Sequence, residues 1–325
     1  MPYSWITYSP AFTLVPTYEC FNRCTYCNFR RDIGTSGWLS LAAAADQLAR
    51  LSPHHVCEIL ILSGEVAPNS PQRSKWVQHL YDLAALALDY GFLPHTNAGP
   101  LTRAEMGYLK QVNVSMGLML EQLTPKLLQT VHRHAPSKVP ELRYAQLEQA
   151  GELGIPFTTG VLLGIGEDPE DSQDSLAAIA KCHQRWGHIQ EVILQPHRPG
   201  QQQQEALPSF DVAQLPQVVQ WARSLLPEDI TLQIPANLVT HPEVLRACLA
   251  FGARDLGGIV PLDHVNPDYP HRDLGALKSQ LRGWGWQLVP RLPIYPQYIP
   301  WLSPDLQARV REAQERFDLS PTLVG

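Results

Sequence analysis

Short apolar, β-branched runs alternate with longer amphipathic stretches along most of the chain. The short runs predict buried strands, and apolar positions that recur every three or four residues predict helices between them. The expected strands cover residues 12–17, 58–63, 92–97, 112–118, 157–163, 191–195, 230–234 and 255–260. The expected helices cover residues 41–51, 74–90, 125–134, 141–153, 172–186, 212–225, 242–251, 272–283 and 304–317.

Eight strands that alternate with helices predict a parallel sheet, and eight is the number of strands that closes a barrel. We therefore expect an α/β fold, a TIM-barrel-like (β/α) barrel, as a single domain with short N- and C-terminal extensions. The core barrel is expected over residues 1–270, with a helical, proline-rich extension over residues 271–325 packed on it. A doubly wound open sheet is the alternative. The sequence lacks the phosphate loop that such a sheet would carry, because Pro169 stands where the third glycine of a dinucleotide fingerprint belongs.

Composition and charge narrow the classes of function. The chain has 325 residues, of which 44% are apolar, and 25 basic against 31 acidic side chains give a net charge of −6. A protein that binds nucleic acid through phosphate contacts normally has a basic surplus, so we expect no nucleic-acid partner. The sequence shows no signal-peptide pattern and no apolar stretch near about 20 residues, so we expect no membrane partner and a cytoplasmic location.

Three of the six cysteines lie close together, directly after the first expected strand. Cys20, Cys24 and Cys27 have the spacing C-x-x-x-C-x-x-C. Thiolates select zinc, copper(I) or iron–sulfur clusters, and a structural zinc site is normally closed by four ligands. Three thiolates on a four-iron cluster would leave one iron with an open coordination position. The compact spacing of the three cysteines favours such a cluster over a zinc site. The alternative is a non-catalytic zinc-binding protein, with a fourth ligand from Cys57, His54 or His55.

The cysteine motif resembles that of the radical S-adenosylmethionine (SAM) superfamily, C-x-x-x-C-x-aromatic-C, with Tyr26 as the aromatic residue. The resemblance implies a radical SAM barrel in which Cys20, Cys24 and Cys27 hold one 4Fe-4S cluster and S-adenosyl-L-methionine binds beside it. Residues 63–65 resemble the turn that holds the SAM amino group, and residues 160–167 resemble the segment near the adenine. The residues assigned to SAM on this resemblance are Ser63, Gly64, Glu65, Asn97, Ser115, Glu121, Arg143, Gly160, Gly164 and Glu167.

Glu121 and Arg143 resemble a carboxylate–guanidinium pair that contacts SAM in the superfamily. A planar guanidinium could grip the methionine carboxylate through two hydrogen bonds. The alternative for Arg143 is an exposed arginine on a helix.

A closer resemblance runs from about residue 9 to residue 270. It rests on CTYCNFR (residues 24–30), SGEVAP (63–68), HTNAGP (95–100), SMGLMLE (115–121) and DHVNP (263–267). These phrases are similar to the CofG family, a subunit of 7,8-didemethyl-8-hydroxy-5-deazariboflavin (FO) synthase. The resemblance implies a radical SAM lyase that converts a tyrosine–ribitylaminouracil adduct to FO with release of ammonia. It also implies a companion subunit, CofH, that makes the adduct, and an electron donor such as flavodoxin or ferredoxin.

Two other radical SAM enzymes remain as alternatives, the CofH-type tyrosine-adding subunit and a futalosine-type cyclase. Polar residues at or near expected strand ends are the candidates for substrate contact: His95, Gln195, His197, Asn237 and Asn266. A mouth lined by neutral hydrogen-bonding groups suits a polyhydroxylated uracil better than a strongly charged substrate. For His95 and His197 a purely structural role is the alternative.

Overall fold

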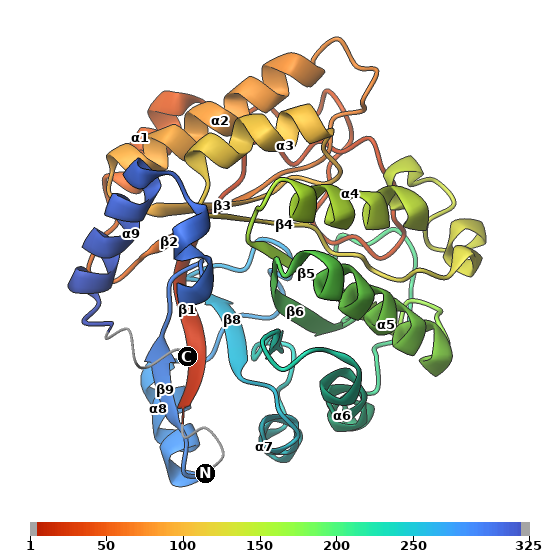
Figure 1. Cartoon of the computed structure of the whole chain (residues 1–325). Coiled ribbons are helices and arrows are strands. Elements are labelled where there is room, and N and C mark those ends of the chain that lie inside the picture. Colours follow the sequence, from red (N-terminus) through yellow and green to blue (C-terminus); the bar gives the residue numbers. More distant parts are fainter. Residues whose placement is uncertain (1–4, 320–325) are drawn as a thin grey trace.

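The computed structural model describes residues 5–319 as a ring of parallel strands surrounded by helices (Figure 1). The barrel strands are β1 (Trp5–Leu14), β2 (Glu58–Leu62), β3 (Leu93–Asn97), β4 (Ser115–Gly117), β5 (Phe157–Leu163), β6 (Ile189–Pro196), β7 (Thr231–Gln233) and β8 (Asp255–Ile259). Neighbours in the sequence pair in parallel, and β1 pairs with both β2 and β8, which closes the ring. The predicted barrel is confirmed, and the open-sheet alternative is wrong.

Helices cover the outside of the ring. The α-helices are α1 (Leu41–Leu48), α2 (Arg73–Asp89), α3 (Arg103–Leu109), α4 (Pro140–Glu152), α5 (Pro169–Trp186), α6 (Leu215–Leu225), α7 (Pro242–Ala250), α8 (Leu274–Gly283) and α9 (Pro304–Arg316). The 3-10 helices are η1 (Lys110–Val112), η2 (Pro125–Gln129), η3 (Pro136–Lys138), η4 (Val212–Gln214) and η5 (Pro296–Trp301). In one example of the packing, α2 buries Trp76 and Leu80 in the same apolar core as Ile59 of β2. Each such side chain contributes about 1.5–3 kcal/mol by leaving water.

The first strand is longer than predicted, because it begins at Trp5 and not at residue 12. Pro10 lies inside it, although proline lacks the N–H that a strand ladder needs. One edge of β1 changes partner at this point. Its first four residues pair with β9 (Gln287–Pro290), and its last four, from Ala11 on, pair with β2. Pro10 therefore interrupts neither ladder on this edge.

Two helical segments also differ from the prediction. Residues 125–134 do not form a helix throughout, since the 3-10 helix η2 ends at Gln129 and Thr130 has φ −124° and ψ −105°. The short helix α3 was not predicted. It begins with a capping box, in which Thr102 and Glu105 each accept a hydrogen bond from the other's backbone N–H. That pair was a readable start signal for the helix.

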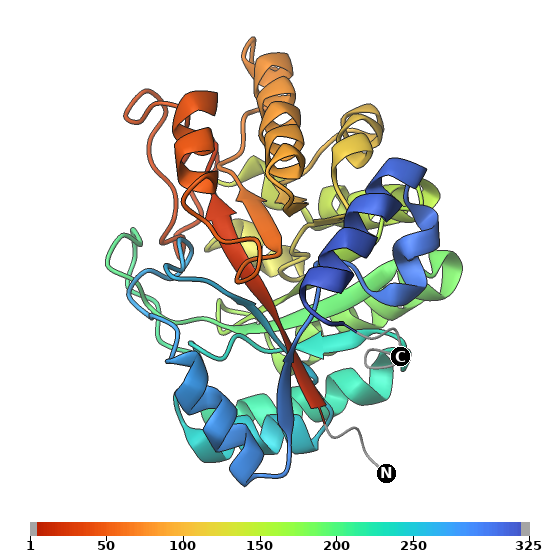
Figure 2. The ribbon, with the colours of Figure 1, turned by 90° about the vertical axis from the view of Figure 1, so that its left-hand side faces the viewer.

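The chain after β9 closes one end of the barrel. A second apolar cluster joins residues of this segment, such as Leu292 and Tyr298, to Leu93 and Val114 at the start of the strands. Figure 2 shows the loops that follow the strands on one side and α9 on the opposite side. Within residues 5–319, the barrel therefore opens toward the loops after its strands. The predicted division of the chain into a core barrel (residues 1–270) and an extension (residues 271–325) stays a prediction. Residues 1–4 and 320–325 of these two segments lie outside the described part of the chain.

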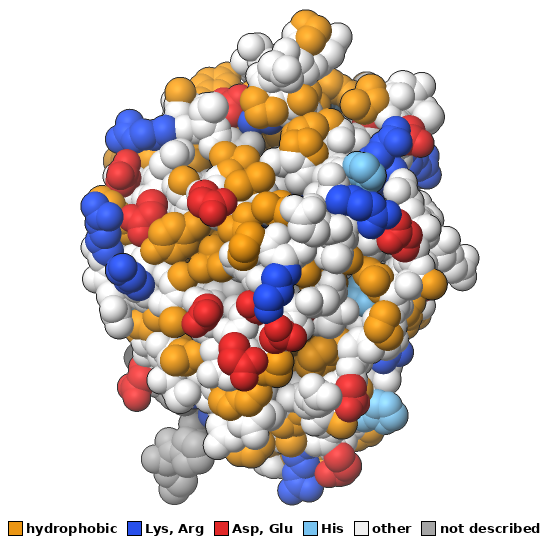
Figure 3. Space-filling view, turned by 90° about the vertical axis from the view of Figure 1, so that its right-hand side faces the viewer, with side chains coloured by type: hydrophobic (Ala, Val, Ile, Leu, Met, Phe, Trp, Pro, Cys, Tyr) orange, Lys and Arg blue, Asp and Glu red, His pale blue; other side chains and the backbone are white. Residues whose placement is uncertain are grey.

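The outer surface carries no extended field of one charge on the face that bears α4 and α5. Figure 3 shows lysine, arginine, aspartate and glutamate side chains interspersed there among apolar atoms. Among the helices of residues 5–319, none combines the length and apolar character needed to cross a bilayer.

Candidate active site

One cavity of about 360 Å³ reaches from the loops after the strands to Arg291 near the closed end of the barrel. Every barrel strand contributes to its lining. Along β2, for example, Glu58, Leu60 and Leu62 line the cavity, while Ile59 and Ile61 belong to the core outside the ring. In barrels of this kind the active site lies at the end where the strands finish, which is also where this cavity opens.

The three clustered cysteines lie at the open end of this cavity. Cys20, Cys24 and Cys27 all line it and all are free thiols. A backbone hydrogen bond of 3.2 Å from the Cys27 N–H to the Cys24 carbonyl fixes the turn between them. Burial raises the pKa of the Cys20 thiol to about 11 and that of Cys24 to about 12. Because iron binds thiolates, loading a cluster here must release protons.

The turn after β2 packs against the start of the cysteine loop. Gly64 donates its N–H to the Thr17 carbonyl at 2.7 Å. A Cβ on Gly64 would stand 2.2 Å from the carbonyl oxygen of Glu19, so only glycine allows this approach. The neighbouring Glu65 accepts hydrogen bonds from the Asn22 amide at 2.9 Å and the Ser137 hydroxyl at 2.5 Å. The predicted segment 63–65 is therefore rigid and faces the cavity.

A buried group of charges lies beside the cysteines. Arg143 Nη2 lies 3.5 Å from Glu121 Oε1, and Arg143 Nη1 lies 3.9 Å from Glu65 Oε1. The Arg143 side chain is only 3% exposed, so the alternative of an exposed helical arginine is wrong. Lys138 adds a third contact, with its Nζ 2.5 Å from Glu121 Oε1. Burial alone would raise the pKa of Glu121, but the charges of Lys138 and Arg143 lower it below its usual value.

The aromatic residue of the cysteine motif is enclosed by two histidines. The Tyr26 hydroxyl lies 3.0 Å from His132 Nε2, and the Tyr26 ring meets the His197 ring edge to face with centroids 6.5 Å apart. Burial, and then the nearby Lys138 charge, lower the pKa of His132 to about 3. His132 is therefore neutral at physiological pH, and Tyr26 is held by an uncharged partner.

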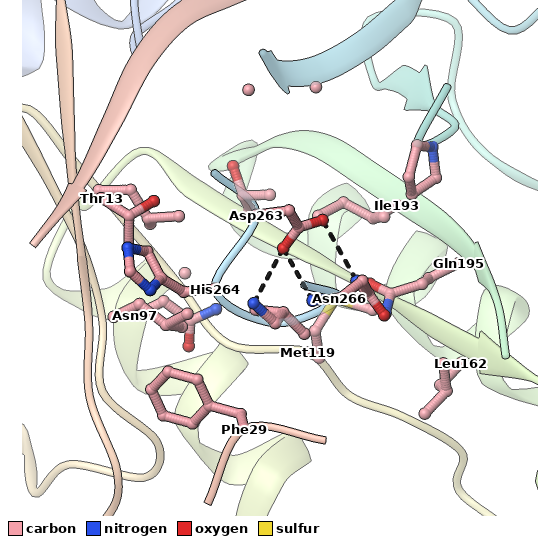
Figure 4. Close-up of a pocket in the computed structure, with 18 of the residues that line it drawn as sticks. Thr13, Phe29, Asn97, Met119, Leu162, Ile193, Gln195, Asp263, His264 and Asn266 are labelled. Carbon is pink, nitrogen blue, oxygen red and sulfur yellow. Dashed lines mark hydrogen bonds between the residues drawn. The ribbon is translucent and has the colours of Figure 1, made fainter. Parts of the chain in front are cut away.

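The opposite side of the mouth carries polar side chains from β6 and from the loops after β7 and β8 (Figure 4). Asp263 organises them: it accepts the backbone N–H of Asn266 at 2.9 Å and the side-chain amide of Asn237 at 2.8 Å. The Asn237 side-chain oxygen is buried without a hydrogen-bond partner in the described chain. Gln195 lies nearby, and Figure 4 shows it beside Asn266 across the cavity from Asn97. These groups leave an acceptor available for a ligand.

The structure brings most of the predicted site residues to this one cavity. Those that line it are Cys20, Cys24, Cys27, Ser63, Gly64, Glu65, His95, Asn97, Glu121, Arg143, Gln195, His197, Asn237 and Asn266. Their assignment to SAM or to substrate stays a prediction.

Four residues assigned to SAM do not line the cavity. Ser115 was expected at or near the end of a strand, but it is the first residue of β4, because residues 112–114 do not belong to the strand. Gly160 lies inside β5, where a Cβ would stand 2.3 Å from the Ile193 carbonyl oxygen. Glu167 accepts the backbone N–H groups of Gly164 and Ile165, which shapes the turn after β5. These residues shape the barrel around the site and do not face its cavity.

The proposed completion of a zinc site by Cys57, His54 or His55 is wrong. Cys57 precedes β2, and its Sγ lies 3.4 Å from the Arg291 carbonyl oxygen at the closed end of the barrel. His54 and His55 lie in the exposed turn just before it. The whole of β2 therefore separates these three residues from the cysteine loop, which meets the turn after β2.

Sequence reasoning did not identify several residues of the site. Lys138 and Ser137 lie in the 3-10 helix η3, far from any recognisable motif. Asp263 lies in a phrase that the resemblance had singled out, and its Asp-x-x-Asn spacing is typical of a turn in which the carboxylate caps the following N–H groups. That signal could have identified Asp263 as the residue that shapes the loop.

The residues at the mouth fit both groups that the cysteine motif implies. Three free thiols around one end of a cavity are the ligands that iron–sulfur clusters take. Beside them, the buried guanidinium of Arg143 suits a carboxylate. Glycine at 64 and at 99 allows the groups around the site to pack closely, since a Cβ on Gly99 would stand 2.3 Å from the Glu65 side chain.

A closed parallel barrel with three free thiols after its first strand, beside a buried guanidinium, defines a radical SAM protein. The model of the Radical SAM superfamily matches residues 14–179. Its cofactors are one 4Fe-4S cluster and SAM, which Cys20, Cys24 and Cys27 and the neighbouring mouth residues would hold.

Curated relatives narrow the family further. The chain is 80% identical to the 7,8-didemethyl-8-hydroxy-5-deazariboflavin synthase of Thermosynechococcus vestitus, over 94% of this chain and 98% of the relative. It is 66% identical to the protein of that name from Trichormus variabilis (95% and 91% covered) and 55% identical to that of Gloeobacter violaceus (96% and 97% covered). The chain belongs to the family of 7,8-didemethyl-8-hydroxy-5-deazariboflavin synthases.

Solved structures agree on the fold at low sequence identity. The FeFe-hydrogenase maturase HydG from Carboxydothermus hydrogenoformans superposes with a TM-score of 0.73 at 19% identity, over 99% of this chain and 76% of that one. Methylornithine synthase (PylB) superposes with a TM-score of 0.67 at 15% identity, over 88% of this chain and 84% of that one.

Proposed function

We propose that this protein is the radical SAM lyase that forms FO from the tyrosine–ribitylaminouracil adduct with release of ammonia. The observation that carries the proposal is the cavity that links the three thiols to the barrel interior. The cavity therefore connects the place where the cofactors would bind with the barrel interior, where a substrate would be shielded from bulk water. High identity to relatives of that name along nearly the whole chain supports this choice over the other radical SAM reactions.

The cluster and SAM, when bound, supply a 5′-deoxyadenosyl radical that abstracts hydrogen. The chain's own residues bind and orient these cofactors and the substrate, and they enclose them. Cys20, Cys24 and Cys27 hold the cluster, and Arg143 holds the carboxylate of SAM. Glu121 and Lys138 fix the guanidinium and its surroundings by ion pairs. Pre-positioning of this kind lowers the barrier by removing the entropy cost of alignment.

Residues of β6 and of the loops after β7 and β8 face the substrate in this proposal. Asn237 offers a buried carbonyl oxygen with no internal partner, and Asp263 holds the Asn237 amide in place at 2.8 Å. A hydrogen-bond donor on the substrate, such as an amine or imide N–H, would supply the missing partner of this oxygen. Neutral groups dominate this side, which suits an uncharged heterocycle.

The test is turnover with defined components. Anaerobically reconstituted protein is incubated with chemically prepared adduct, SAM and a reductant, and deazaflavin fluorescence is followed together with 5′-deoxyadenosine. The proposal expects both products without added tyrosine. Turnover that needs free tyrosine would instead identify the CofH-type reaction. Protein with about one zinc and no acid-labile sulfide would support the zinc-binding alternative.

Two further parts of the proposal concern partners and location. The adduct needs a supplier, which we propose to be the companion subunit CofH, and the cluster needs an electron donor such as a flavodoxin or a ferredoxin. All six cysteines are free thiols, which is typical of a reducing compartment such as the cytoplasm.

A further inference from the structure

The inner end of the cavity holds a cluster of polar side chains that the proposed function has not used. We call it the barrel floor: Glu58, His95, Thr158, Glu191, Gln233 and Arg291, all of which line the cavity. It lies opposite the cysteine loop, at the end that the chain after β9 closes. His95 is 7% exposed and Glu58 is 8% exposed, so this is a buried surface.

The geometry fixes which nitrogen of His95 carries the proton. The Ser115 hydroxyl lies 2.5 Å from the Pro293 carbonyl oxygen and must donate to it, because a carbonyl can only accept. The Ser115 oxygen lies 2.7 Å from His95 Nδ1. Because Ser115 donates its single hydroxyl hydrogen to Pro293, its oxygen can only accept a hydrogen bond from His95 Nδ1. His95 therefore carries its proton on Nδ1, and Nε2 presents a lone pair.

The free lone pair of His95 lies in the cavity. No hydrogen bond to Nε2 is formed by any residue that the structure describes. A Cβ on Gly117, another cavity residue, would stand 2.8 Å from Nε2, so glycine at this position leaves room for the imidazole. Burial, and then the charge of Arg291, lower the pKa of His95 to about 3. His95 thus stays a neutral acceptor at any physiological pH.

The charged and amide donors of the floor are already engaged within the described chain. Arg291 donates from Nε to Asp255 at 2.6 Å and from Nη2 to Glu191 at 2.8 Å. With its amide nitrogen turned toward Glu191, Gln233 donates to that carboxylate at 3.0 Å. The Gln190 amide beside the floor donates to the Pro293 carbonyl at 3.0 Å. What the floor still offers a ligand is therefore acceptors, above all His95 Nε2. A chain of hydroxyl groups can supply donors to it, whereas a phosphate would meet carboxylates whose arginine is already paired.

Apolar positions follow the floor on the way to the mouth. Along β2 the inward residues after Glu58 are Leu60 and Leu62, and along β6 the inward residue after Glu191 is Ile193. The cavity thus changes from polar floor to apolar middle and back to a polar mouth. Such a profile matches a flat ring that carries a hydroxylated tail.

We propose that the barrel floor is a polyol subsite, in which the ribityl chain of substrate and product points toward the closed end and donates a hydrogen bond to His95 Nε2. The flat ring then occupies the apolar middle, next to the cysteine end. The proposal rests on the proposed function, because it takes the ribityl chain from that reaction. It assigns His95 to specificity and Ser115 to positioning His95.

The test compares three ligands on cluster-reconstituted protein: FO, an FO analogue with a methyl group in place of the ribityl chain, and FO phosphorylated on its terminal hydroxyl. Binding is measured through deazaflavin fluorescence. We expect the parent protein to bind FO at least about tenfold more tightly than either analogue. His95→Phe should reduce the preference over the methyl analogue to about twofold, whereas His95→Gln, which keeps an acceptor, should retain most of it. His241→Phe, at an exposed site, is the matched control.

The outcomes separate the two proposals. If the parent protein binds none of the ligands, the proposed function itself fails. If FO binds but the methyl or the phosphorylated analogue binds equally well, the polyol subsite is overturned and the function stands. Equal weakening of FO and the methyl analogue by His95→Phe also overturns it. Should that variant fail to fold, Ser115→Ala, which frees the imidazole, replaces it with the same expected loss of preference.

Discussion

The ammonium nitrogen of Lys138 lies 2.5 Å from Glu121 Oε1, and both side chains are about nine-tenths buried. Removing one partner of a buried ion pair leaves a charge without compensation, which typically costs about 3–5 kcal/mol. Arg143 at 3.5 Å remains as a second partner for Glu121. We therefore expect Lys138→Met to lower the free energy of unfolding in urea by about 3 kcal/mol, the lower end of that range.

A double variant tests the cause of that loss. Lys138→Met combined with Glu121→Gln should be less destabilised than the sum of the two single variants, because no unpaired carboxylate remains. Additive losses would show that the two side chains do not act as a pair.

Cys24→Ala should abolish SAM cleavage and leave the barrel folded. Cys24 lies on a loop at the mouth and belongs to none of the apolar core clusters. The measurements are 5′-deoxyadenosine by chromatography and secondary structure by circular dichroism. Cys248→Ala is the matched control, since Cys248 is buried on α7 and does not line the cavity. It should keep its iron and its activity, while undiminished cleavage in Cys24→Ala would refute the ligand assignment.

Gly64→Ala should damage both stability and SAM binding. The added Cβ would stand 2.2 Å from a backbone oxygen of Glu19, which cannot move without shifting the cysteine loop. We expect a loss of about 2–3 kcal/mol in the free energy of unfolding, as for other overpacked sites. Gly37→Ala is the control, because nothing lies within 4 Å of a Cβ there, and it should change stability by less than about 0.5 kcal/mol. Equal effects at the two glycines would contradict the close approach.

The sequence predicted the barrel well because parallel strands buried on both faces give apolar runs that stand out from the helices. The predicted strand at residues 157–163 coincides with β5. The prediction failed where the apolar pattern extends beyond the residues that pair in the sheet. Residues 112–114 read as strand, yet Lys110–Val112 is a 3-10 helix, and Ser115 therefore begins β4 when it was expected near the strand's end.

The site was predictable as far as its residues lie close together in the chain. Cys20, Cys24 and Cys27 form a local pattern whose chemistry can be read directly. Arg291 cannot be found in that way, because its carboxylate partners Asp255 and Glu191 lie 36 and 100 residues away in the sequence. Only the closure of the barrel brings these three residues together.

Arg291 should be among the most costly residues to replace. It is buried and contacts Asp255 at 2.6 Å and Glu191 at 2.8 Å. Arg291→Met leaves two carboxylates without a positive partner, so we expect a loss of about 3–5 kcal/mol in urea unfolding. Arg291→Met with Glu191→Gln should recover part of it. If the single variant is as stable as the parent protein, the floor does not depend on this ion pair.

His95 should make stability depend on pH in a defined window. Its pKa is lowered to about 3 by burial and by Arg291, whereas an unfolded histidine has a pKa of about 6.5. Between these values the unfolded chain binds a proton that the folded chain does not. The contribution of His95 is therefore complete above about pH 6.5 and declines by about 1.4 kcal/mol for each pH unit below it.

Replacing His95 removes that dependence. Free energies of unfolding in urea, measured from pH 7 to pH 4, should fall less steeply for His95→Gln than for the parent protein, by about 1.4 kcal/mol per pH unit. His132 and His188, whose pKa values burial also lowers to about 3, keep a residual slope of the same sign. His241→Gln, at an exposed position, should follow the parent curve. Parallel curves for His95→Gln and the parent protein would mean that folding does not lower the pKa of His95, which would contradict a buried, neutral imidazole at the barrel floor.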